Sequence, residues 1–99
     1  MPTADPVELV SRFTYLGEQT IEGNGSSQEA TLPSETNVIF VSAEGGPIYY
    51  SINGDASVNS GGYVPEDSVR IVPETLNLIS FEVYMTADIN AHLQYFKYE

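Results

Sequence analysis

His92 is the single histidine of the chain, and there is no cysteine, so few side chains could act as a base, a nucleophile or a soft metal ligand. A transition-metal site usually takes several His or Cys ligands at short spacing. Serine hydrolases hold a histidine between a hydroxyl and a carboxylate, and no G-x-S-x-G pattern marks a strained nucleophile turn. We therefore predict that this protein is not an enzyme, and that His92 is exposed or paired across strands.

Carboxylates are the most abundant chemical groups, with 14 acidic residues against three basic ones. Two carboxylates can cleave a glycosidic bond, and hard oxygens such as those of residues 53–55 can hold calcium. The acidic pair Glu66-Asp67 and the calcium-like Asn53-Gly54-Asp55 lack any further motif, including EF-hand spacing. We predict solvated loop charges here, and neither a metal nor a cofactor.

The net charge of −11 restricts the partners. Nucleic-acid binding depends on Lys and Arg that neutralise phosphates, and anionic membranes attract basic segments. We therefore predict that the chain binds neither nucleic acid nor membranes. No apolar run approaches the roughly 18 residues of a membrane-spanning helix, and the start lacks a signal-peptide pattern. The acids indicate a solvated surface, a basic partner or adaptation to high salt.

Short alternating segments bounded by turn residues indicate β-strands throughout residues 12–99. Seven or eight of them predict an all-β domain, an antiparallel β-sandwich or jelly-roll-like barrel. We expect the strands at residues 12–22, with a bulge near Gly17, and at 28–32, 37–43, 48–52, 63–64, 69–72, 76–85 and 89–95. Strand 37–43 is apolar on both faces and should be covered on both sides. Residues 1–11 form a separate N-terminal arm, with one helical turn at 6–10 indicated by Asp5-Pro6.

Two strand pairings follow from local signals. Asn53-Gly54 tolerates the positive φ angles of a type I′ turn, which predicts a hairpin between residues 47–52 and 55–58. The two most regular strands, 76–85 and 89–95, should form a second antiparallel hairpin. Its inward side chains would be Ile79, Phe81, Val83, Ile89, Ala91 and Leu93.

Aromatic residues are the remaining binding groups: seven tyrosines and four phenylalanines, with no tryptophan. Adjacent rings such as Tyr49-Tyr50 and Tyr95-Phe96 must point to opposite faces of a strand, so one of each pair faces away from the core. Outward rings either shield a strand edge or form a contact patch for a protein. A sugar-binding site lined by these aromatic rings is a third hypothesis, although there is no tryptophan. The predicted partner-binding residues are Pro6, Val7, Leu9, Val10, Phe13, Tyr15, Tyr49, Tyr63, Tyr84, Phe96 and Tyr98.

The turn and strand pattern of residues 48–57, 60–65, 76–81 and 91–96 resembles small all-β virion proteins of tailed bacteriophages. The resemblance implies a capsid decoration (cement) protein that binds the major capsid protein or another virion protein. It also implies a homo-oligomer, with a trimer as one form, located on the capsid surface after assembly in the host cytoplasm. The apolar arm residues would then lie on a neighbouring subunit. The alternative is a carbohydrate- or receptor-binding β-sandwich of a phage tail or fibre.

Overall fold

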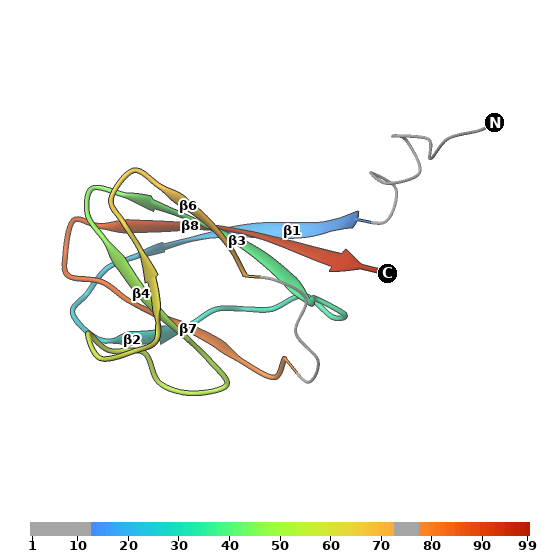
Figure 1. The fold of residues 1–99 in the computed structure, drawn as a ribbon, viewed down its shortest axis with the longest axis horizontal. Helices are drawn as coiled ribbons and strands as arrows, with labels where there is room; N and C mark the ends of the chain where they lie inside the picture. Colours follow the sequence, from blue (N-terminus) through green and yellow to red (C-terminus); the bar gives the residue numbers. More distant parts are fainter. Residues whose placement is uncertain (1–12, 73–77) are drawn as a thin grey trace.

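The computed structural model describes residues 13–72 and 78–99, and these residues form two antiparallel four-stranded sheets (Figure 1). The strands are β1 (Phe13–Glu22), β2 (Ser27–Glu29), β3 (Val38–Glu44), β4 (Ile48–Ile52), β5 (Gly62–Val64), β6 (Val69–Val72), β7 (Phe81–Tyr84) and β8 (Asn90–Tyr98). The strand order is β1-β8-β3-β6 in the first sheet and β2-β7-β4-β5 in the second. The predicted all-β antiparallel sandwich of seven or eight strands is confirmed.

The core lies between the two sheets and follows from the period-two alternation of the strands. In β8, Ala91, Leu93 and Tyr95 point inward and are buried, whereas Asn90, His92 and Gln94 alternate with them. Phe81 and Val83 of β7 meet them from the second sheet and are also buried. The core therefore consists mainly of aliphatic side chains, which bury apolar surface without leaving polar groups unpaired.

A bulge divides β1, the longest strand, into two halves. Tyr15 pairs with Phe96 and Gly17 with Tyr95, which leaves Leu16 as an extra residue on β1. Gly17 has φ 148°, a backbone conformation that side-chain-bearing residues rarely adopt. The predicted bulge near Gly17 is confirmed, and it is the point at which the inward-facing positions of β1 change from even to odd residue numbers.

The predicted hairpin between residues 76–85 and 89–95 is wrong, because β7 and β8 belong to different sheets. β7 pairs with β2 and β4, whereas β8 lies between β1 and β3. The connection at residues 85–89 therefore crosses from one sheet to the other. Of the expected core side chains, Ile79 is 79% exposed, and the other five are buried.

The predicted tight turn at Asn53-Gly54 is also wrong. β4 pairs with β5 instead of residues 55–58, so a long loop joins the two strands. Asn53 does have a positive φ of 60°. Its side-chain oxygen accepts hydrogen bonds from the backbone N–H groups of Ile79 and Ser80 at 2.7 and 2.9 Å. Asn53 therefore anchors the loop to the segment before β7.

The N-terminal arm, with Pro6, Val7, Leu9, Val10 and the helical turn at residues 6–10, lies outside the described residues. So does the start of the expected strand at 76–85. Strand β2 is shorter than the predicted 28–32. Within residues 13–72 and 78–99, no helix has the length and apolar character required to span a membrane.

Candidate binding surface

Five aromatic rings gather on the outer side of the first sheet, and we call them the aromatic face: Phe13, Tyr15, Phe40, Phe96 and Tyr98. The antiparallel register places Tyr15 of β1 directly opposite Phe96 of β8, and Phe13 opposite Tyr98. Phe96 is the centre, with ring centroids 5.7 Å from Tyr15, 4.9 Å from Phe40 and 6.3 Å from Phe13. Phe13 also contacts Tyr98 at 5.0 Å. These distances are typical of aromatic contacts.

Two aliphatic side chains of β6 extend the aromatic face to the other edge of the sheet. Phe40 of β3 pairs with Ile71, and Ser42 pairs with Val69. Ile71 is 53% exposed and Val69 is 61% exposed. Apolar side chains from all four strands thus lie on one side of one sheet, a larger grouping than single surface hydrophobics.

The aromatic face is open to solvent on the side away from the core. Tyr15 is 53% exposed and Phe13 is 44% exposed, while Phe96 and Phe40 are partly buried by their neighbours. Strand β3, which we expected to be covered on both sides, packs against the second sheet on its inner side, and on its outer side Val38 is buried and Phe40 is partly buried. Covering about 100 Å² of a half-exposed ring is worth roughly 2 kcal/mol. A partner that covers several of these rings therefore gains a large part of its binding free energy from them.

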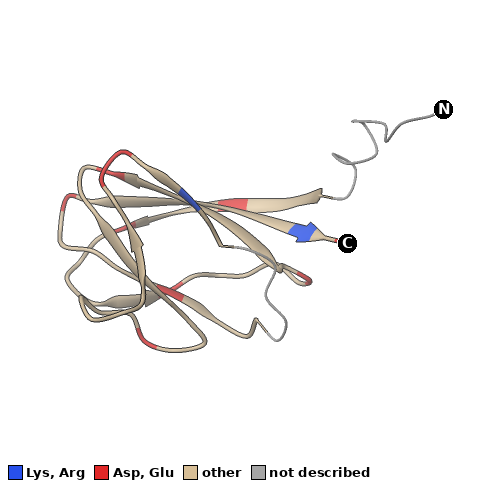
Figure 2. Ribbon diagram, viewed as in Figure 1, with Lys and Arg blue, Asp and Glu red and all other residues tan. Residues whose placement is uncertain are grey.

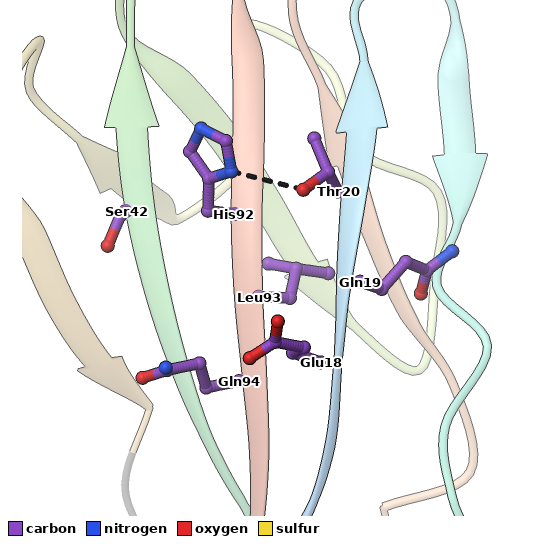
Figure 3. A pocket seen from close by; sticks show the side chains of 7 residues that line it. All are labelled: Glu18, Gln19, Thr20, Ser42, His92, Leu93 and Gln94. Atoms are coloured by element: carbon purple, nitrogen blue, oxygen red, sulfur yellow. Dashed lines mark hydrogen bonds between the residues drawn. The ribbon is translucent and has the colours of Figure 1, made fainter.

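The other half of the same sheet surface is polar (Figure 3). His92 of β8 contacts strands on both sides: its Nδ1 lies 3.1 Å from the Thr20 hydroxyl, and its Nε2 lies 2.7 Å from Glu44 Oε1. The hydrogen bond from His92, together with one from Asn90, lowers the pKa of the Glu44 carboxyl. The prediction that His92 is exposed or paired across strands is confirmed.

In this polar cluster a hydroxyl, an imidazole and a carboxylate are joined in a row by hydrogen bonds, as they are in the active site of a serine hydrolase. However, the His92 and Glu44 side chains are 45% and 62% exposed, and Thr20 lies within a regular strand. The surrounding hollow is formed by the sheet surface itself, with Gln94, Ser42 and Glu18 nearby. Among the described residues, no group of three His, Asp or Glu side chains could hold a metal ion. The cluster is best described as a cross-strand hydrogen-bond network.

Figure 2 shows acidic residues spread over both sheets and their loops, and basic residues in β6 and at the end of β8. The described part of the chain contains two cations, Arg70 and Lys97, and both alternate with members of the apolar surface in β6 and β8. Lys97 Nζ lies 3.2 Å from Glu35 and 3.6 Å from Glu99, and the hydrogen bond with Glu35 raises the pKa of the Lys97 ammonium. The Tyr15 hydroxyl donates to Glu18 at 2.8 Å, which raises the pKa of that phenol. Of these acidic side chains, Glu18 therefore lies beside the aromatic face, at Tyr15.

A second aromatic group lies on the outer side of the second sheet, and we call it the tyrosine row. Tyr49 of β4 pairs with Tyr63 of β5 on one side and with Tyr84 of β7 on the other. The ring of Tyr49 lies 5.2 Å from that of Tyr63 and 6.3 Å from that of Tyr84, in both cases tilted by more than 50°. Beside it, the Ser27 hydroxyl donates to Glu82 at 2.7 Å. The row offers phenol groups with a hydrogen-bonded serine and carboxylate.

The seven described residues of the predicted partner-binding set therefore divide between two opposite faces. Phe13, Tyr15, Phe96 and Tyr98 belong to the aromatic face. Tyr49, Tyr63 and Tyr84 form the tyrosine row. The sequence prediction missed Phe40, Val69 and Ile71, because their place depends on the pairing of β3 with β6. The alternation of Val69 and Ile71 with Arg70 could have indicated that these two apolar side chains share one face of their strand.

Comparisons with protein-family models, with curated proteins and with solved structures found no match.

Proposed function

We propose that this protein is a structural protein that binds another protein through the aromatic face, and that its partner is the capsid surface of a tailed phage. The specific role is that of a decoration protein that stabilises the major capsid protein or another virion protein. The sequence resemblance supplies this specific form. The observation that carries the proposal is the aromatic face itself, extended across four strands by Val69 and Ile71.

The chemistry of the aromatic face favours a protein over other partners. Protein interfaces are enriched in Tyr and Phe and depleted of charge at their centre, as the five rings and two aliphatic side chains are. The acidic surface around them disfavours phosphate backbones and anionic lipids. The rings contact one another before any partner arrives, so little side-chain entropy remains to be lost on binding.

Co-sedimentation with capsids of the phage that carries the gene tests this proposal. We expect Tyr15→Ser combined with Ile71→Ser to weaken binding at least tenfold, since losing about 100 Å² of covered apolar surface costs roughly 2 kcal/mol, about 30-fold. Both side chains are half exposed, so the variant should remain folded by circular dichroism.

Tyr63→Ser, which removes a similarly exposed tyrosine from the opposite face, is the matched control and should bind normally. Equal binding by all three proteins would contradict the role of the aromatic face. Failure of the unaltered protein to co-sediment would contradict the decoration role.

A second candidate function is carbohydrate or receptor binding by the tyrosine row, as in a tail or fibre module. The alignment of three tyrosines on neighbouring strands, next to the Ser27–Glu82 hydrogen bond, favours it. Tyrosine rings can pack against sugar rings while their hydroxyls form hydrogen bonds. A glycan array should then give signals that Tyr63→Ala abolishes and Tyr15→Ala leaves intact. An array without signals would exclude glycans as ligands.

A further inference from the structure

Among the described residues the two sheets have four edge strands, and β1 is the one that lacks the usual protection against strand pairing. Proteins protect sheet edges by short strands, charged side chains or prolines. Strands β2 and β5 have three residues each, and β5 is followed by Pro65. Strand β6 has four residues and contains Arg70. Strand β1 has ten residues, and its first five, Phe-Thr-Tyr-Leu-Gly, contain no charge.

The second half of β1 is covered by the neighbouring loop, whereas the first half is not. The Gln19 side-chain oxygen accepts a hydrogen bond from the Thr31 N–H at 2.9 Å, and Gln28 donates to the Glu22 carbonyl at 2.7 Å. Pro33 lies against Gly17. Of the hydrogen bonds formed within residues 13–72 and 78–99, none reaches the outer backbone edge of residues 13–16. Figure 1 shows this start of β1 and the end of β8 extending side by side to the right of the sandwich body.

We propose that residues 13–15 pair with the same residues of a second copy of the chain, antiparallel about a twofold axis, so that Thr14 lies opposite Thr14 and Phe13 lies opposite Tyr15. The two first sheets then form one continuous eight-stranded sheet. This inference goes beyond the proposed function, because the second copy pairs with the backbone edge of β1 and not with the aromatic face. Backbone groups that lack a partner supply the hydrogen bonds, as in other strand additions.

Two features favour a second copy of the chain as the partner of the uncovered edge of β1. A twofold axis perpendicular to the sheet brings identical outer faces to the same side, so Phe13 and Tyr15 of one copy lie beside those of the other. The two aromatic faces thereby become one apolar surface. In addition, a chain with a net charge of −11 can approach itself only through an uncharged segment. Pairing limited to residues 13–15 keeps Glu18 and Glu22 outside the paired segment.

This geometry predicts a dimer instead of the trimer that the sequence resemblance implies. An edge that pairs with its own copy about a twofold axis is used up by that contact, so the assembly closes at two subunits. The protected edges β2, β5 and β6 offer no second site of the same kind. Because the copies repel each other electrostatically, salt should strengthen the dimer, whereas salt would weaken binding to a basic partner.

Sedimentation velocity on the full-length chain over a range of concentrations, at low and at high salt, tests the inference. We expect a monomer–dimer equilibrium that high salt shifts toward dimer. Thr14→Lys should lower the association constant at least tenfold, because two lysines would then face each other across the axis. Thr20→Lys adds the same charge on the covered half of the same strand and should leave association nearly unchanged.

Hydrogen exchange gives a second readout, since the amides in residues 13–15 should exchange more slowly as the concentration of the unaltered protein rises. A monomer at every concentration, a trimer, or equal effects of Thr14→Lys and Thr20→Lys would each overturn the inference. A monomer that dimerises only after removal of residues 1–11 would also overturn it, since the edge would then be filled by the chain's own arm. A monomer that still binds capsids would leave the proposed function standing.

Discussion

Ile39 and Ile71 lie on neighbouring strands of the first sheet and differ in which side of it they occupy. Ile39 of β3 faces the second sheet and is fully buried, whereas Ile71 of β6 faces outward and is 53% exposed. The same contrast separates Tyr95 from Phe96, which are adjacent in β8. The hydrophobic residues of this sheet thus serve two purposes. One set holds the fold together, and the other set is left exposed by the described residues and is the set that we propose binds a partner.

The largest difference between the two sides should appear when each isoleucine is truncated. Ile39→Ala removes packed atoms from the core and should lower the free energy of unfolding by about 2–5 kcal/mol. Ile71→Ala should change it by less than about 0.5 kcal/mol, because its side chain is already half in water. Urea denaturation of both variants measures the difference. Similar losses would mean that the outer side contributes to folding as much as the core does.

A smaller, pH-dependent difference in the free energy of unfolding should appear between variants of two tyrosines of β8, Tyr95 and Tyr98. Burial raises the pKa of Tyr95 to about 12, from an ordinary value near 10, and its hydroxyl donates to Gln19 at 2.7 Å. Since the unfolded chain releases this proton first, stability is complete below about pH 10 and falls as the pH rises toward about 12. The part due to Tyr95 is roughly 3 kcal/mol.

Tyr95→Phe should therefore flatten the decline of unfolding free energy in this alkaline range, measured by denaturation at several pH values. Tyr98→Phe, on the outer side of the same strand, should retain the decline. If the two variants gave the same slope, the hydroxyl of Tyr95 would not be the group that the fold keeps protonated.

Period-two alternation was sufficient to predict the strands and most of the core from the sequence. Gly17 predicted the bulge, and Phe81, Val83, Ala91 and Leu93 were placed inward correctly. Alternation works because a strand's two faces are determined locally, whatever it pairs with. The same rule required one ring of Tyr49-Tyr50 and one of Tyr95-Phe96 to face outward, and in the structure these are Tyr49 and Phe96.

Strand pairing could not be predicted in this way, because it depends on contacts between distant residues. Asn53 looked like half of a tight turn, but its side chain instead holds the backbone of Ile79 and Ser80. Strands β7 and β8 are adjacent in sequence and regular, yet each finds its partners elsewhere. The full extent of the aromatic face could not be predicted for the same reason, because only the β3–β6 register places Ile71 next to Phe40.

The bulge in β1 also restricts how the length of this protein can change. The extra residue, Leu16, allows Tyr15 before it and Thr20 after it to point outward, while Ile21 points into the core. Loss of one residue here would remove the bulge and reverse the inward and outward faces of one half of the strand. Either Phe13 and Tyr15, or Glu18 and Glu22, would then point into the core. Relatives of this chain should thus accept insertions and deletions in the loops, but keep the number of residues between Phe13 and Glu22 constant.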